Sequence, residues 1–326
     1  MAYYDRLEHA VVKRARAARD RWPVVDHLWR SYDRFDGVYG TRLAAANAYY
    51  AFFAAFALGV LTFAVVGWAI PGGADNAGLR AVQDYLSTNL PQLEAQSLTN
   101  ASKSVGVLAV IGLIIAGVAW VETLRSSQRA IWCLEQEPGH PVLRWLLDLS
   151  VLAGLGVLLL ASLAVSSGII GVLQRLTKEA GDFLPEQATA GALDWTDTLL
   201  GAAIDLVLAS AVLAGVPRLR MTFRRLIPSA LLVVVGFGVM KVIGRWFISR
   251  TQHNPAYENF AAAAAAVGLL LFMYLVHHVI LFAAALAATS VHGRVLDLAT
   301  RPAVEVDCGT DAEAARNPHL IRLQKE

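Results

Sequence analysis

Long apolar stretches separated by short polar segments dominate this 326-residue sequence and restrict what it can fold into. An α-helix needs about 20 apolar residues to cross a hydrocarbon core roughly 30 Å thick, and helices satisfy their backbone hydrogen bonds internally where water is absent. Six stretches reach or approach that length, at residues 43–70, 105–121, 146–173, 199–216, 227–248 and 260–289. The sequence therefore predicts an all-α, polytopic membrane protein built as a bundle of six transmembrane helices.

The composition agrees with lipid as the main solvent of the chain. Hydrophobic residues make up 56% of the sequence and charged residues only 17%, whereas soluble domains carry about 25% charged residues. The formal net charge of +2 is too small for a typical nucleic-acid-binding surface. Membrane lipids are therefore the expected partners, and no nucleic acid is expected. The first apolar stretch is too long for a cleavable signal peptide, so we expect a retained helix.

The positions of lysine and arginine predict the orientation in the membrane, because short cytoplasmic loops carry an excess of both residues. Of the 28 lysines and arginines, 21 lie before the first span, after the second, after the fourth and after the last. The alternate loops hold five. We therefore expect a multi-pass protein with both termini in the cytoplasm.

The chain divides into three predicted parts. Residues 1–41 interleave apolar and basic positions, which suits an amphipathic helix at the cytoplasmic lipid surface or, equally, a solvated helix that joins the first span. Residues 42–290 form the transmembrane domain. Residues 291–326 are expected to form a flexible cytoplasmic tail. Small residues are abundant in the spans and are compatible with a homo-oligomer, but they would equally pack a monomer.

Ionisable residues at membrane depth are expensive unless they are paired or face water, so each is a candidate for function. Asp205 and Lys241 lie at matched depths in the fourth and fifth predicted spans, roughly 9 to 10 Å from their outer ends at about 1.5 Å per residue. An ion pair between them could line an outward cavity. The alternatives are a purely structural pair, or a lysine that extends to the interface.

His277 and His278 lie nearer the middle of the last span. Adjacent residues point about 100° apart on a helix, so both can face the interior only obliquely. One of them could relay protons near neutral pH, or it could be a neutral histidine hydrogen-bonded between helices. Three secondary candidates lie near the inner surface: Asp148 as a cap or anchor of the third span, and Asn47 and Tyr50 as polar groups of a cytoplasmic-side cavity or of an interfacial belt.

The common catalytic motifs are absent from the sequence. It contains no G-x-x-x-x-G-K-[ST] phosphate loop, no H-E-x-x-H zinc motif and no G-x-S-x-G nucleophile turn. We therefore expect no catalytic residues, no bound cofactor or metal, and no enzymatic activity.

Three segments resemble, in order, the YihY/BrkB family of bacterial inner-membrane proteins. RLAAANAYYAFFAAFAL at residues 42–58 is similar to the opening helix of that family, and LIPSALL at 226–232 is close to its l-P-G-A-l pattern. NPAYENFAAAAAAVGLLLFMYLVHHVILFAAALAA at 254–288 is similar to its last span. The match depends on loose apolar patterns over about residues 42–288.

Several positions depart from the family pattern. Ala57 stands where a proline is common, Ser229 replaces a glycine, and Phe272 replaces a tryptophan. Ala283 and Ala285 occupy the glycine and glutamate positions of the last span. Any role that depends on that glutamate therefore cannot be transferred to this chain.

The resemblance implies a six-helix protein of the bacterial inner membrane that is associated with envelope integrity. For some members it also implies export of envelope lipid or lipopolysaccharide precursors. An older ribonuclease label of the family is rejected here, because the sequence offers neither a metal site nor a basic RNA-binding face. Our hypothesis is a transporter or flippase-like exporter, with Asp205, Lys241, His277 and His278 lining or gating its cavity. A non-transporting scaffold for envelope proteins is the main alternative, and a lipid-modifying membrane enzyme is a third hypothesis.

Overall fold

A computed structural model of the chain describes residues 19, 21–69, 95–158, 199, 201–251, 261–299 and 304–306. Most of these residues are helical. The labelled helices are α2 (Pro23–Gly37), α3 (Gly40–Ala69), α5 (Ala95–Ile131), α8 (Phe223–Thr251) and α9 (Ala261–Ala288). Two further helices cover Pro141–Leu158 and Gly201–Gly215, and the second ends in the π-helical segment η2 (Ala211–Gly215).

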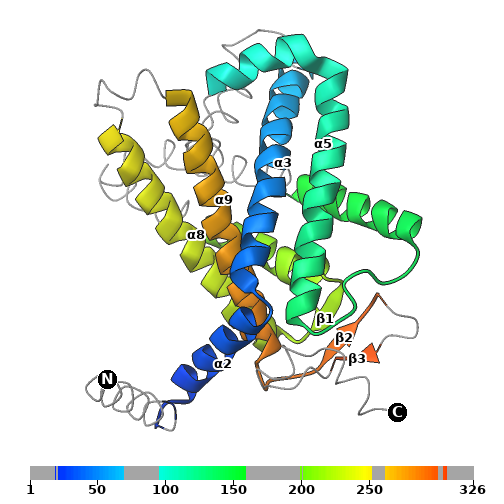
Figure 1. Ribbon diagram of the computed structural model, residues 1–326, viewed down its shortest axis with the longest axis vertical. Helices are drawn as coiled ribbons and strands as arrows, with labels where there is room; N and C mark the ends of the chain where they lie inside the picture. Colours follow the sequence, from blue (N-terminus) through cyan, green and yellow to red (C-terminus); the bar gives the residue numbers. More distant parts are fainter. Residues whose placement is uncertain are drawn as a thin grey trace, which may run out of the picture.

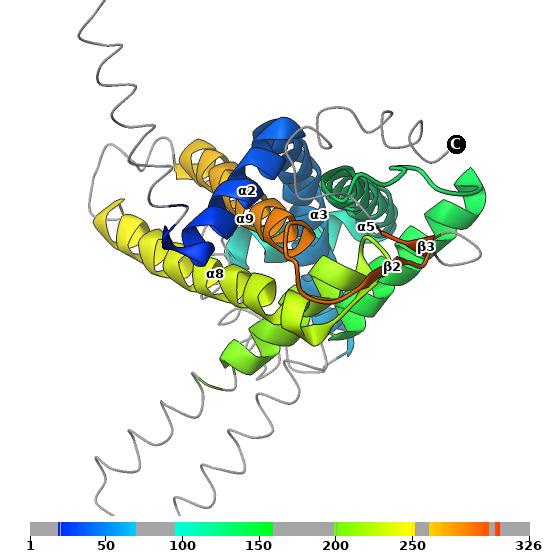
Figure 2. The same cartoon turned by 90° about the horizontal axis from the view of Figure 1, so that it is seen from below.

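The long helices form one bundle. α3 runs beside α5, and α9 packs against both α3 and α8 (Figure 1). Seen from below, α9 lies between α8 and the α3–α5 pair, and α2 crosses its end (Figure 2). α9 consists largely of alanine and leucine, the residues with high helix propensity, and its small side chains allow neighbouring backbones to approach closely.

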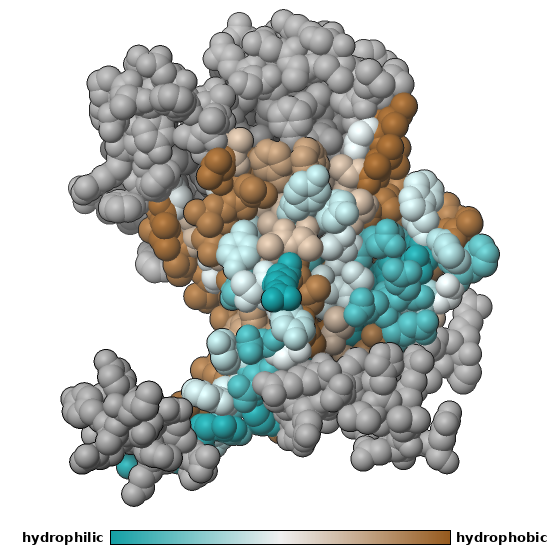
Figure 3. Space-filling view, viewed as in Figure 1, coloured by the Kyte–Doolittle hydropathy of each residue, from teal (hydrophilic) through white to brown (hydrophobic). Residues whose placement is uncertain are grey.

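Three helices of the described chain are long and apolar enough to cross a membrane. They cover Pro141–Leu158, Phe223–Gly244 and Ala266–Ala288. The outward side of α8 exposes apolar side chains at helical spacing, including Leu231, Val235 and Val239. Figure 3 shows hydrophobic side chains along both flanks of the bundle. Such continuous apolar stripes are unusual on a soluble monomer and fit contact with lipid.

α5 extends beyond the predicted span at both ends. Residues 105–121 were expected, whereas the helix covers the 37 residues Ala95–Ile131. The prediction ended at the first charged residues, Glu122 and Arg125. The helix continues because Arg125 and Arg129 are fully buried and bonded to partners from other segments. Of the expected third span, residues 159–173 lie outside the described residues.

A small sheet at one end of the bundle adds β-structure that the all-α prediction did not include. β1 (Leu219–Met221), β2 (Val295–Asp297) and β3 (Val304–Glu305) form an antiparallel sheet in the order β1-β2-β3. We call this end of the bundle the sheet end. β2 and β3 belong to the segment that was expected to be a flexible tail. The residues before Arg19, where the amphipathic pattern was strongest, lie outside the described residues.

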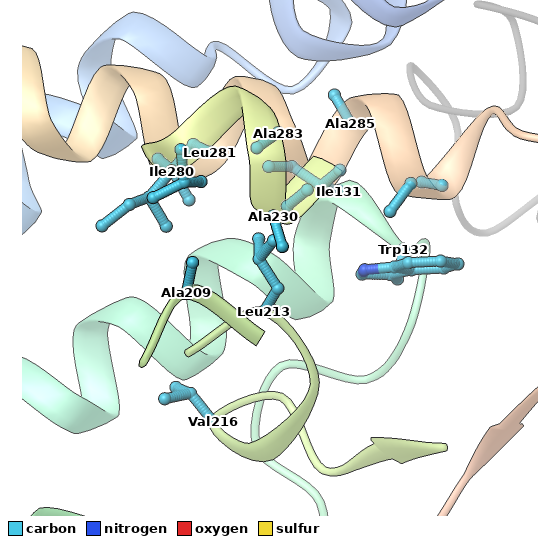
Figure 4. Close-up of a cluster of buried hydrophobic side chains, with 14 of the residues drawn as sticks. Ile131, Trp132, Ala209, Leu213, Val216, Ala230, Ile280, Leu281, Ala283 and Ala285 are labelled. Carbon is cyan, nitrogen blue, oxygen red and sulfur yellow. The ribbon is translucent and has the colours of Figure 1, made fainter. Parts of the chain in front are cut away.

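The main hydrophobic core lies around the second half of α9. Figure 4 shows Ile280, Leu281, Ala283 and Ala285 of α9 among apolar side chains of neighbouring elements. These neighbours include Ile131, Trp132, Ala209, Leu213 and Ala230. The core therefore joins α5, the 201–215 helix, α8 and α9 near the sheet end.

Candidate functional site

A cavity of about 510 Å³ lies between the helices. Six helices contribute to its walls, and almost all of the lining side chains are apolar. One representative from each helix, in chain order, is Ala54, Trp120, Leu152, Ala209, Phe237 and His277. The cavity is therefore formed by the bundle as a whole.

Among the described residues that line this cavity, His277 is the only one with an ionisable side chain. It is buried, and both of its ring nitrogens have partners. The Nε1 group of Trp120 donates to Nε2 of His277 at 2.9 Å, and Nδ1 lies 2.7 Å from the carbonyl oxygen of Met273. An indole nitrogen can only donate, so Nε2 accepts and Nδ1 carries the proton. This arrangement corresponds to the neutral, hydrogen-bonded histidine of the sequence analysis and presents no free polar atom to the cavity.

Asp205 and Lys241 form an ion pair one helical turn beyond the cavity lining. Nζ of Lys241 lies 3.2 Å from Oδ2 of Asp205, and both side chains are partly exposed. Asp205 precedes the lining residue Ala209 by one turn, and Lys241 follows Phe237 by one turn. The pair thus lies at the end of the cavity opposite the sheet, which we call the far end.

The other sequence candidates do not line the cavity. His278 packs on Phe35, with ring centroids 4.7 Å apart, so the two adjacent histidines face different surroundings. Asn47 is buried, and its amide donates to the Ser127 hydroxyl at 2.8 Å. Tyr50 is exposed on α3. Asn47 therefore joins α3 to α5, and neither residue contributes to a polar cavity at this level.

Asp148 lies at the sheet end of the cavity, next to the lining residue Leu149, within a buried charge cluster. Its carboxylate accepts from Nε of Arg125 at 3.0 and 3.2 Å and from Nη2 of Arg125 at 3.1 Å. It also accepts from Nη2 of Arg218 at 2.9 Å. Nη1 of Arg125 donates to the carbonyl of Gln136 at 2.7 Å. Burial lowers the pKa of Arg218, and the neighbouring Asp148 opposes this shift.

A second buried ion pair continues this cluster. Both terminal nitrogens of Arg129 donate to the carboxylate of Asp297, at 3.0 and 2.8 Å. Arg129 also donates to the carbonyls of Glu135 and Pro217. Because Asp297 belongs to β2, this pair connects the segment after α9 to the end of α5.

Four residues of the charge clusters could not be recognised from the sequence, because they were assigned to loops or the tail: Arg125, Arg129, Arg218 and Asp297. One signal was available: Arg125 and Arg129 are one turn apart, so they share a helix face once α5 is extended. The hydrogen-bonding role of Trp120 had no sequence signal. Within the described residues, no group of three or more histidine, cysteine, aspartate or glutamate side chains is placed to hold a metal ion.

Comparison with known proteins assigns the chain to a family. Residues 31–304 match the family described as Virulence factor BrkB, which covers most of the sequence. The chain belongs to the BrkB family. The described helices, cavity and charge clusters fall almost entirely within the matched region.

The chain is also similar to two bacterial membrane proteins. The chain is 26% identical over 292 residues to the inner membrane protein YhjD of Escherichia coli (strain K12), covering 83% of this chain and 82% of that protein. It is 27% identical over 282 residues to a UPF0761 membrane protein of Rhodospirillum rubrum, covering 84% of this chain and 60% of that protein. No solved structure matches the chain. This BrkB-family chain is a membrane protein.

Proposed function

We propose that this BrkB-family chain is a transporter or flippase-like exporter of an envelope lipid or similar amphiphile, and that it contributes to envelope integrity. The observation that supports this proposal is the cavity of about 510 Å³ between the six helices. Its volume lies within the roughly 300–1,000 Å³ that is usual for small-molecule sites.

The chemistry of the cavity walls favours a hydrocarbon ligand. Trp120 and His277 satisfy each other, and the other lining side chains are apolar. A sugar or phosphate group in this cavity would lose its hydrogen bonds to water without replacement, which is costly. An acyl or isoprenoid chain loses nothing of this kind. We therefore assign the cavity to the hydrocarbon part of the amphiphile.

The ends of the cavity differ from its middle. The Asp205–Lys241 pair lies at the far end, and the cluster around Asp148 lies at the sheet end. A polar head group at either end would meet charged partners while its chain stayed in the apolar middle. The polar–apolar–polar order along the bundle thus suits an amphiphile that crosses from one side to the other. In this proposal Asp205 and Lys241 gate the far end.

We further propose a six-span topology in the bacterial inner membrane, with both termini in the cytoplasm. The name of the relative, inner membrane protein YhjD, supports the choice of membrane, and the lysine and arginine bias supports the orientation. α2 then lies at the cytoplasmic lipid surface. Its exposed side chains include Val24, Leu28, Trp29 and Tyr32, and tryptophan and tyrosine favour the headgroup level.

The main alternative is a scaffold that recruits other envelope proteins without transport. A sealed, fully packed bundle would favour that function, whereas the cavity between the helices favours transport. A lipid-modifying enzyme is less well supported, because the described part of the cavity lining contains a single ionisable side chain.

A lipid-translocation assay in proteoliposomes tests the proposal. An impermeant reductant quenches fluorescent phospholipids in the outer leaflet of the vesicles. Fluorescent phospholipids of the inner leaflet are quenched only after they move outward, so the rate of their quenching reports translocation. We expect the native chain to exceed empty liposomes and Ala153→Trp to be slower, because Ala153 lines the cavity. Val157→Trp is the matched control, since Val157 is exposed on the same helix and does not line the cavity.

Two results would contradict the proposal. Native protein that adds nothing to the rate of empty liposomes, across phospholipid and lipopolysaccharide-precursor probes, would favour the scaffold. Equal rates for Ala153→Trp and Val157→Trp would separate translocation from the cavity. Neutralising Asp205, Lys241, His277 and His278 together tests their role, and undiminished transport in that variant would remove it.

A further inference from the structure

We propose that Arg218 is the moving part of a gate at the sheet end of the cavity. In the structure Arg218 is ion-paired with Asp148 at that end, and in this proposal release of Arg218 opens the cavity toward the sheet-end face. The inference rests on the proposed transport function, because a transporter exposes its site to the two sides in turn.

The two arginines on Asp148 are held unequally. Arg125 makes three hydrogen bonds to this carboxylate and a fourth to the Gln136 carbonyl, and its side chain is fully buried. Arg218 makes one bond to Asp148, at 2.9 Å, and 14% of its side chain is exposed. Arg125 is thus a fixed part of the cluster, whereas Arg218 can leave it by losing one contact.

The charges of the cluster allow this release. Asp148 keeps Arg125 as its partner when Arg218 departs, so no buried carboxylate is left without a cation. Arg129 keeps Asp297. Arg218 itself moves from a partly buried position into water, where a guanidinium is well solvated. Breaking a buried pair is strongly unfavourable when it leaves an uncompensated charge inside, and this step leaves none.

The backbone at Arg218 has the features of a joint. Arg218 has a φ of +60°, which is uncommon for a residue with a side chain. It follows Pro217 and the π-helical segment η2, and π-helical segments occur frequently at functional sites. Strain of this kind persists where surrounding contacts hold it. Here they are the backbone bonds of Arg218 with Gly215 and Leu298 and the side-chain bond to Asp148, and only the last is lost in the proposed release.

The joint is connected directly to the cavity wall. Val212, within η2, lines the cavity, and its carbonyl accepts a hydrogen bond from Gln128 at 3.2 Å. On the other side of the ion pair, Asp148 immediately precedes the lining residue Leu149. The Arg218–Asp148 bond therefore joins two walls of the cavity, and its loss would let them separate.

Thiol labelling tests the gate. The reporter is the Ala153→Cys variant, because Ala153 lines the cavity. Its labelling by a membrane-impermeant maleimide is measured, and the labelling of the same chain with Ala153 unchanged is subtracted as background. Right-side-out and inside-out vesicles present the two faces separately. A cysteine at Arg220, exposed on β1, identifies in the same vesicles which face carries the sheet end.

Arg218→Asn is the principal variant, because asparagine tolerates a positive φ and removes the guanidinium. We expect labelling of the reporter to rise at least threefold from the sheet-end face and to stay unchanged from the other. Arg218→Lys should remain closer to the native rate. The matched control is Arg220→Asn, two residues away, which should leave labelling unchanged.

Unchanged reporter labelling in Arg218→Asn, or an equal rise in Arg220→Asn, would overturn the gate. Where Arg218→Asn does not elute as a monodisperse species, Arg218→Gly replaces it, since glycine also suits this backbone conformation. The lipid-translocation assay is read separately. A change in labelling without lipid translocation would refute the transport function and leave the gate supported. Lipid translocation without a change in labelling would refute the gate and leave the transport function supported.

Discussion

Nε1 of Trp120 donates a 2.9 Å hydrogen bond to Nε2 of His277, joining α5 to α9 in the wall of the cavity. The bond occupies the acceptor nitrogen of His277, while the Met273 carbonyl occupies the other nitrogen. The most polar side chain of the cavity is therefore satisfied by the protein. This keeps the wall dry and suited to hydrocarbon.

Trp120→Phe should destabilise the protein by about 1–3 kcal/mol, because it leaves a buried acceptor without a partner. Thermal unfolding in detergent, followed by circular dichroism, measures the change. The double variant Trp120→Phe with His277→Leu removes both polar groups and should cost less than the sum of the single variants. A Trp120→Phe protein as stable as the native one would show that this bond contributes nothing.

Asp148→Asn should be far more damaging than Asp205→Asn. Removing the Asp148 charge leaves Arg125 buried without its carboxylate, and breaking a buried pair typically costs about 3–5 kcal/mol. The Asp205–Lys241 pair is partly exposed, so its loss should cost less than the loss of the fully buried Arg125–Asp148 pair. Expression level and unfolding temperature of the two variants, compared in one detergent, measure the order. The reverse order would contradict the assigned burial.

Gly236→Ala should separate α8 from α9. A Cβ at Gly236 would lie 2.7 Å from Cγ1 of Val279, and such overpacking costs about 1–3 kcal/mol. Gly238→Ala is the control on the same helix, because nothing lies within 4 Å of its added carbon. Val279→Ala should restore the stability of Gly236→Ala. Equal unfolding temperatures for the two alanine variants would refute this packing.

α2 should dock less firmly on α9 as the pH falls below about 6.5. Burial is the main cause that lowers the pKa of His27, and the nearby charges of Arg30 and His292 lower it further. The bond to the Leu286 carbonyl and the charge of Asp26 oppose this shift. The undocked state therefore binds a proton more readily than the docked state. Neutral His27 therefore contributes its full stabilisation of docking above the ordinary histidine pKa. This stabilisation is lost as the pH falls from the ordinary pKa toward the lowered pKa of His27.

Hydrogen exchange of the α2 amides at pH 7.5 and 5.5, corrected for intrinsic rates, measures this effect. The native chain should lose protection in α2 at the lower pH. His27→Gln still offers a donor to the Leu286 carbonyl but cannot titrate, so its protection should be less sensitive to pH. A native α2 equally protected at both values would contradict the prediction.

Helix periodicity and depth predicted part of the geometry of the site. Asp205 and Lys241 were paired from their distances along two helices, and the structure places them 3.2 Å apart. Both His277 and His278 were predicted to line or gate the cavity, but only His277 lies in its wall, and His278 packs against Phe35 because adjacent residues point about 100° apart. These predictions needed only the geometry of single helices.

The charge clusters could not be predicted in the same way, because their partners come from distant segments. Arg125 was counted among loop cations, yet it is buried against Asp148. Recognising this pair requires the end of α5 and the start of the 141–158 helix to be placed in three dimensions. Two further arginines of the positive-inside count are also held in ion pairs, the buried Arg129 and the partly buried Arg218. A charge bias read from sequence therefore includes cations that serve internal packing.

The Arg129–Asp297 pair has a consequence for the biogenesis of the protein. Arg129 is synthesised and its helix is inserted well before the ribosome reaches Asp297, which follows the last span. Until then this guanidinium must stay hydrated or bound to another anion, because a lone buried cation is strongly disfavoured. The sheet end is therefore completed late, because Arg129 gains this carboxylate only when the segment that follows α9 has been made.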